Sequence, residues 1–410
     1  MDPRIADAQQ KLSGVFARLD QIEQENTRRI LDAFAAHRVA ERHFAGTSGY
    51  GYGDEGRDTL EKIYADVFGA QAALVRPAIA SGTHALAIAL FGVLRPGQTI
   101  LAATGKPYDT LEEVIGIAGD GDGSLRQMGV SYRQVELDGH GAPDFEAIAG
   151  AVDEKTALVA VQRSCGYAMR PSLGIEQIER IVRVVKQKNP NAAVMVDNCY
   201  GEFTQTREPT HVGADLIAGS LIKNPGGGLA PTGGYLCGRA DLIEKCAKRL
   251  TSPGIGAEVG SYTPGYRLFY QGLFLAPHVV MQAVRGAALC AQVFSDMGYE
   301  VLPAPQAPRN DIIQAIKLGS GEKLIRFCQA VQAASPVEGY VLPEPWDMPG
   351  YTSPVIMAAG TFVSGASIEL SADGPMRPPF AAYLQGGLTY THVVLALEKI
   401  LGALEETPAL

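Results

Sequence analysis

Residues 213–235 read GADLIAGSLIKNPGGGLAPTGGY, an apolar run followed by a lysine and a row of glycines. Leu216–Ala218 is apolar at consecutive positions, which is typical of a strand buried on both faces of a parallel sheet. Ser220 and Lys223 follow it directly, and Gly226–Gly228 then breaks any regular element. Ligands of open α/β sheets bind beyond the carboxyl ends of the strands. A lysine at such a position is therefore a candidate functional residue.

Short apolar runs of this kind recur between residues 72 and 237 and alternate with amphipathic stretches. Helical periodicity covers Thr83–Leu94, Asp144–Val152 and Ile175–Lys188. This alternation predicts an α/β fold with a mostly parallel sheet of seven strands and helices on both faces. The seven predicted strands are Ala72–Val75, Thr99–Ala102, Ser131–Val135, Ala157–Val161, Ala193–Val196, Leu216–Ala218 and Gly234–Cys237.

Segments with other patterns flank this region on both sides. We expect an N-terminal helical segment over residues 1–45, a large α/β domain over 46–285 and a small α+β C-terminal domain over 286–410. A long helix over residues 276–297 is expected where the last two meet. The pattern within the small domain predicts strands at Glu300–Leu302, Ile312–Lys317 and Ser367–Leu370, and helices near Glu322–Ala334 and Leu388–Leu401.

Composition excludes several classes of protein. The 410 residues are 46% hydrophobic and 19% charged, so a large core is possible and global disorder is excluded. A net charge of −9 argues against nucleic acid as the main partner. The N-terminus lacks the pattern of a signal peptide, and no 18-residue apolar stretch predicts a membrane span. The six cysteines lack metal-site spacing, so we expect reduced thiols, no metal and a cytoplasmic protein.

Two other strand ends carry candidate binding residues. Ser81-Gly82-Thr83 follows the first strand and opens a helix, where free N–H groups can bind an anion such as phosphate. The alternative is an ordinary helix cap by Ser81 or Thr83. Asp197 ends the fifth strand, where an acid is costly unless a cation pairs with it or it caps the next turn.

Together these features meet the needs of pyridoxal phosphate. A helix start can hold the phosphate, an acid can pair with the pyridinium nitrogen, and Lys223 can form a Schiff base. The chain resembles the fold-type I pyridoxal-phosphate enzymes of the Cys/Met-metabolism branch, in particular the subfamily called methionine gamma-lyase-like or aluminium-resistance protein. The stretches that carry this resemblance are GYGYGDEGRDTLE (49–61), RPAIASGTHALAIAL (76–90), VDNCYGEF (196–203), residues 213–235 and ELSADGPMRPPF (369–380).

The resemblance implies pyridoxal 5′-phosphate as cofactor and a role for five residues around it. Lys223 is then the Schiff-base lysine and the later proton shuttle. Asp197 keeps the pyridine nitrogen protonated. Ser220 and the amides of Gly82 and Thr83 bind the phosphate.

Four further residues take roles from the same resemblance. Tyr108 stacks on the cofactor ring and assists a leaving thiolate. Tyr52 and Arg57 reach the phosphate of a neighbouring subunit, which implies a homo-oligomer, a dimer or tetramer. Arg377 is the candidate clamp for a substrate carboxylate, for which a bidentate guanidinium is well suited.

The function that this resemblance implies is a carbon–sulfur lyase. It eliminates a thiol from a sulfur amino acid (methionine, cystathionine or a cysteine-like compound) and yields a 2-oxo acid and ammonia. Three alternatives stay open: an aminotransferase, a β/γ-replacement enzyme, or a binding protein for the cofactor and an amino acid with weak lyase activity. The partner of the cofactor's phenolic oxygen is also open between Gln162 and Ser164.

Overall fold

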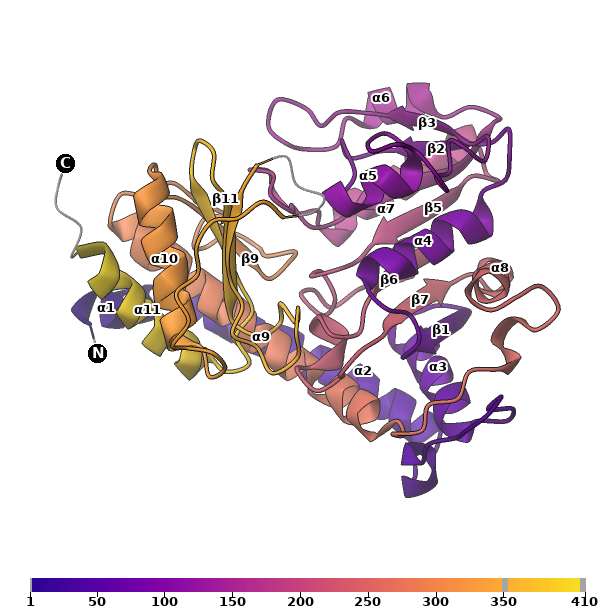
Figure 1. Ribbon diagram of the computed structural model, residues 1–410, viewed down its shortest axis with the longest axis horizontal. Coiled ribbons are helices and arrows are strands. Elements are labelled where there is room, and N and C mark those ends of the chain that lie inside the picture. Colours follow the sequence, from indigo (N-terminus) through magenta and orange to yellow (C-terminus); the bar gives the residue numbers. More distant parts are fainter. Residues whose placement is uncertain (1, 349–352, 406–410) are drawn as a thin grey trace.

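The chain forms two sheets that lie side by side and share one long helix, as the computed structural model shows (Figure 1). The structure describes residues 2–348 and 353–405. The larger sheet has the order β1-β7-β6-β5-β4-β2-β3. Its strands are β1 (Ala72–Arg76), β2 (Thr99–Ala102), β3 (Ser131–Gln134), β4 (Thr156–Gln162), β5 (Ala193–Asp197), β6 (Leu216–Ser220) and β7 (Gly234–Gly238).

All seven strands predicted from the sequence are confirmed. Strands β2 to β6 pair in parallel, whereas β7 runs antiparallel to both β1 and β6. Helices cover both faces of this sheet. Alternate residues of each buried strand point to opposite faces and pack against different helices. These helices are α3 (Glu55–Val67), α4 (Gly82–Val93), α5 (Asp109–Ile115), α6 (Phe145–Ala151), α7 (Ile175–Lys188) and α8 (Ala240–Leu250).

The smaller sheet is antiparallel and has the order β10-β11-β12-β9-β8. Its strands are β8 (Val301–Leu302), β9 (Ile313–Lys317), β10 (Val355–Ala358), β11 (Ser371–Pro375) and β12 (Ala381–Gln385), and α10 (Gly321–Ala334) and α11 (Tyr390–Glu405) accompany them.

The predicted strand at Ser367–Leu370 is wrong. Ile368 and Leu370 are buried, as alternating strand residues would be, but the backbone turns there. The Glu369 N–H donates to the Ala366 carbonyl, and the Glu369 carboxylate accepts the N–H groups of Phe362 and Val363. This segment is therefore a turn that the Glu369 side chain stabilises, and it leads into β11.

Helix α9 (Arg267–Asp296) connects the two halves of the molecule and begins nine residues earlier than predicted. It is long and apolar enough to cross a membrane, yet 72% of its most apolar 18-residue window is buried inside the fold. The predicted domain boundary after residue 285 lies within this helix, so the division into domains stays a prediction. Helices α1 (Pro3–Lys11) and α2 (Ser13–Ala36) pack along it, and short 3₁₀ turns lie at Glu41–Phe44, Pro209–Val212, Asn224–Gly226 and Gly256–Glu258.

Candidate active site

The alternation of buried side chains brings Asp197 and Ser220 to one face of the large sheet. Ala193 and Met195 of β5 pack in the same apolar cluster as α4, and so do Leu216 and Ala218 of β6. Asp197 and Ser220 are the next residues in these two rows. Both therefore reach the sheet edge on the side where α4 begins.

Helix α4 starts with groups that suit an anion. Ser81 caps it, because its Oγ accepts the His84 N–H at 3.1 Å. The amides of Gly82 and Thr83 lie in the first turn, where a helix supplies no acceptors of its own. A Cβ on Gly82 would come within 3.3 Å of the Cys199 Sγ and 3.5 Å of the Ser220 Cβ. Glycine thus lets the helix start approach β6 closely.

Lys223 follows β6 and points its amine at an aromatic ring. Its Nζ lies 4.1 Å from the centroid of the Tyr200 ring. Burial alone lowers the pKa of Lys223, yet Cys199 and Tyr200 oppose this and, with Asp197, leave the pKa above its ordinary value. The lysine is therefore charged in the absence of a covalent partner.

Asp197 shares this environment. Its Oδ1 accepts the Cys199 N–H at 3.1 Å. Burial raises the pKa of Asp197, while the Lys223 ammonium acts in the opposite direction. The charged form of an acid in such a place is stabilised by a cationic partner, as expected from its position at the end of a buried strand.

Tyr200 is a functional candidate that sequence reasoning missed. Its φ is +72°, a left-handed conformation that is rare for a bulky residue and common at functional sites. The Asn224 Nδ2 donates to the Tyr200 carbonyl at 3.0 Å, and the Ser367 Oγ donates to the Tyr200 hydroxyl at 2.9 Å. Only its position three residues after Asp197 hinted at the site.

These groups line one central cavity of about 200 Å³, small enough for a single-ring ligand. Six of the nine predicted site residues meet there: Gly82, Thr83, Tyr108, Asp197, Ser220 and Lys223. Gln162 and Ser164 line it as well. The Ser164 Oγ donates to the Asp311 Oδ2 at 2.9 Å, and the Gln162 Nε2 donates to the Ser164 carbonyl at 3.2 Å.

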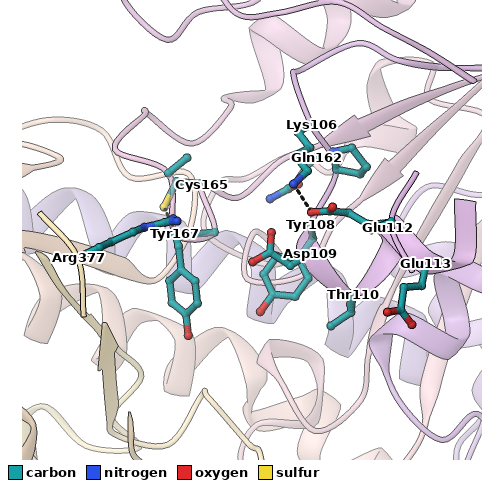
Figure 2. A pocket seen from close by; sticks show the side chains of 14 residues that line it. Lys106, Tyr108, Asp109, Thr110, Glu112, Glu113, Gln162, Cys165, Tyr167 and Arg377 are labelled. Carbon is teal, nitrogen blue, oxygen red and sulfur yellow. Dashed lines mark hydrogen bonds and ion pairs between the residues drawn. The ribbon is translucent and has the colours of Figure 1, made fainter. Parts of the chain in front are cut away.

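Arg377 lines a different, outer cavity of about 760 Å³. The outer and central cavities share Tyr108, Gln162 and Gly166. Figure 2 shows Arg377 on one side of the outer cavity and Glu112 on the other, with Tyr108 between them. Glu112 is held by Lys106 at 2.6 Å.

Tyr52 and Arg57 lie outside both cavities. The Arg57 guanidinium is buried and donates to the Gly51 carbonyl at 2.8 Å and the Gly260 carbonyl at 3.3 Å. Tyr52 is 66% exposed and lies beside Tyr50, which is 73% exposed. Their predicted contact with a neighbouring subunit stays a prediction.

A buried polar network supports the central cavity from the opposite face of β6. The Tyr235 hydroxyl donates to the Glu202 Oε1 at 2.7 Å, and burial raises the pKa of Glu202 to about 8. A Cβ on Gly219 would come within 2.8 Å of that Oε1, so only glycine fits above it. The Arg163 Nη1 donates to the Asn198 Oδ1 at 2.8 Å and extends the network.

A lysine and a carboxylate at the edge of a seven-stranded α/β sheet, beside a helix start that can hold phosphate, define a fold-type I pyridoxal-phosphate enzyme. The chain belongs to the methionine gamma-lyase family, whose profile matches residues 2–405. This family comprises carbon–sulfur lyases and implies pyridoxal 5′-phosphate as the cofactor.

The chain is also similar to individual proteins. The uncharacterized protein YnbB of Bacillus subtilis is 54% identical over 387 residues, which cover 94% of this chain and 92% of the relative. A solved structure named a carbon–sulfur lyase involved in aluminium resistance, from Clostridium novyi, is 51% identical with a TM-score of 0.94, covering 97% of this chain and 94% of that one. L-methionine gamma-lyase of Pseudomonas putida is 26% identical over 236 residues, covering 55% of this chain and 48% of that enzyme.

Proposed function

We propose that the protein eliminates a thiol from a sulfur amino acid and releases a 2-oxo acid and ammonia. The observation that carries this proposal is the meeting of Lys223 and Asp197 in one cavity, with Tyr108 shared between that cavity and the larger outer one. The substrates that we expect are methionine, cystathionine or a cysteine-like compound.

Four groups of the central cavity are proposed to hold the cofactor. The amides of Gly82 and Thr83, with Ser220, bind its phosphate. Asp197 pairs with its ring nitrogen, which agrees with a carboxyl whose charged form needs a cation. When bound, pyridoxal phosphate withdraws electrons from the carbon that carries the substrate's amino group.

The phenolic oxygen of the cofactor is better served by Gln162 than by Ser164. The Ser164 hydroxyl already donates its proton to Asp311. The Gln162 amide nitrogen has two N–H groups, of which one donates to the Ser164 carbonyl. The second N–H of Gln162 is therefore the donor that we assign to this oxygen.

Three side chains are proposed to act on the substrate. Lys223 removes the proton from the α-carbon once its amine is released from the cofactor. Tyr108 lies between the two cavities and donates a proton to the leaving sulfur. Arg377 in the outer cavity binds the substrate carboxylate and so orients the α-carbon.

A panel of amino acids tests this function on the purified holoenzyme. L-methionine, cystathionine, S-methylcysteine and cysteine are supplied one at a time, and thiol, 2-oxo acid and ammonia are measured together. Equal amounts of all three products from at least one compound support the proposal. Steady exchange of amino groups between an amino acid and a 2-oxo acid, without thiol, favours an aminotransferase. Binding without turnover favours the binding-protein alternative.

The function also includes an assembly proposal. We propose a homo-oligomer, a dimer or tetramer, because Tyr50 and Tyr52 are exposed at 73% and 66% on a segment rich in glycine. We also propose that the protein is cytoplasmic. Light scattering at micromolar concentration measures the mass. A fully active monomer contradicts this proposal without affecting the proposed chemistry.

A further inference from the structure

A third cavity adjoins the central one on the side of the small sheet. It has a volume of about 130 Å³, enough for about four water-sized groups. It shares Tyr108, Tyr200 and Gly365 with the central cavity, so the two are neighbours. We call it the side chamber. Ser371, Asp373 and Gln385, from β11 and β12, complete its polar wall.

The side chamber contains two buried polar atoms that need a partner. Asp373 is 7% exposed and Ser371 is 5% exposed, and as residues i and i+2 of β11 they face the same side of the sheet. The Asp373 Oδ1 and the Ser371 Oγ have no hydrogen bond to any residue within 2–348 or 353–405. An unsatisfied buried group costs about 1–3 kcal/mol, so a bound donor is stabilised here.

The other carboxylate oxygen shows how Asp373 is held. Its Oδ2 accepts the Gln385 Nε2 at 3.2 Å. This contact holds the carboxyl group in place in the wall of the chamber, which Asp373 and Gln385 both line. Asp373 is thus positioned before any ligand arrives.

We propose that the side chamber binds the distal arm of the sulfur amino acid, the part that leaves as thiol, and that this arm carries an ammonium group. The Asp373 Oδ1 accepts an N–H of the ammonium, and Ser371 accepts a second. This inference rests on the proposed function, because only a substrate attached in the central cavity can extend past Tyr108 and Tyr200 into the chamber.

The charge of Asp373 agrees with such a ligand. Burial raises the pKa of Asp373 to about 7, although Tyr167 and Gln385 favour its charged form. A bound ammonium favours the carboxylate further, so binding below pH 7 releases a proton. An arm without positive charge has no such effect.

Other titratable groups around Asp373 do not mask this dependence. Cys328 of α10, Tyr383 of β12 and Tyr200 interact electrostatically with Asp373. Tyr108 and Tyr167 also line the chamber. Burial raises the pKa of Cys328, Tyr383 and Tyr200 above the ordinary value. These three groups stay neutral between pH 6 and 8, and a response near pH 7 reports on Asp373.

Two cysteine conjugates of equal length test the proposal on the holoenzyme. S-(2-aminoethyl)-L-cysteine ends in an ammonium group, and S-propyl-L-cysteine ends in a methyl group. The dissociation constant of each is read from the visible absorption of the bound cofactor, and kcat/KM from release of 2-oxo acid. Asp373→Asn is expected to lower the preference for the aminoethyl compound about 10- to 100-fold. Asp347→Asn, an exposed acid of the same part of the chain, leaves that preference unchanged.

A pH series on the unmodified protein needs no variant. The same preference is expected to fall about tenfold from pH 8 to pH 6, as Asp373 gains its proton. A preference that is equal in Asp373→Asn and constant with pH means that the chamber holds water only and overturns the inference. Absence of thiol from every conjugate contradicts the proposed function instead, while the dissociation constants still decide on the chamber.

Discussion

The two sheets contribute to the site in different ways, and their sequences differ accordingly. Strands β5 and β6 are continuous apolar runs whose last residues, Asp197 and Ser220, stand out as polar. Strand β11 reads SADGP and is fully buried, although three of its five residues are Ser, Asp or Pro. The sequence of the large sheet therefore indicates candidate site residues, whereas the sequence of the small sheet does not.

This difference separates the cofactor chemistry from substrate choice. Buried parallel strands must be apolar, so a polar residue at their end is conspicuous. The antiparallel strand β11 carries polar side chains within its length: Asp373 accepts a hydrogen bond from Gln385 of the next strand and leaves its other carboxylate oxygen unpaired among the described residues. We infer that Lys223 and Asp197 define the reaction type, while β11 and β12 select the substrate.

Lys223→Ala has the largest expected effect. It removes the proposed attachment point and the base, and general acid–base catalysis alone is typically worth about 10²–10⁴ in rate. We expect 2-oxo acid release to fall at least about 10⁴-fold. Lys248→Ala, a change of an exposed lysine paired with Glu244, is the matched control. A Lys223 variant that releases 2-oxo acid within tenfold of the wild-type rate would show that the large sheet does not supply the essential group.

Asp197→Asn ranks second. The amide keeps the shape and loses the charge, so a charge-assisted hydrogen bond worth about 1.5–3 kcal/mol is lost. We expect kcat to fall about 10- to 100-fold with the fold retained, as checked by circular dichroism. Asp241→Asn, which changes an exposed acid, is the control. Unchanged kcat would reduce Asp197 to the cap of the Cys199 amide.

Tyr200 lines both the central cavity and the side chamber, so its variants test a residue that belongs to both regions. Tyr200→Phe keeps the ring over the Lys223 amine and loses only the hydrogen bond to Ser367. Tyr200→Leu loses the ring, and a cation–π contact is worth about 0.5–2 kcal/mol. We expect exchange of the substrate α-proton in deuterated water to slow about 3- to 30-fold in the Leu variant and less in the Phe variant. Equal rates in both variants would argue against a role for the ring.

The pH dependence of the free energy of unfolding allows one buried acid from each region to be compared. Burial raises the pKa of Glu202 to about 8 and that of Asp373 to about 7. Both hold protons in the folded state at pH values where the unfolded chain has lost them. Their contribution is therefore complete below about pH 4 and is lost as pH rises through 8 or 7, by up to about 1.4 kcal/mol per pH unit each.

Glu202→Gln and Asp373→Asn each remove one of these slopes. Denaturant unfolding between pH 5 and 9 measures the free energy of wild type and variants. The difference for Asp373→Asn is expected to level off near pH 7, and that for Glu202→Gln about one pH unit higher. Curves that run parallel at every pH would show that neither acid is protonated in the folded protein.

The extent to which sequence predicted this molecule follows the same division. All seven strands of the large sheet and six residues of the central cavity were predicted, because apolar runs and the residues after them are local signals. The sequence did not predict β10, β11 or β12, and the strand predicted at Ser367–Leu370 is a turn that precedes β11. Tyr200 had only its position after Asp197 as a signal and Asp373 had none, since a left-handed φ and a cavity wall arise only from tertiary packing.

Reductive trapping tests the central claim most directly. Borohydride is added to the purified yellow holoenzyme, and the protein is digested and mapped by mass spectrometry. We predict that the visible absorption band shifts and that the reduced cofactor is attached to Lys223, in the peptide that follows β6. A cofactor attached to any other lysine, or no attachment at all, would contradict the account.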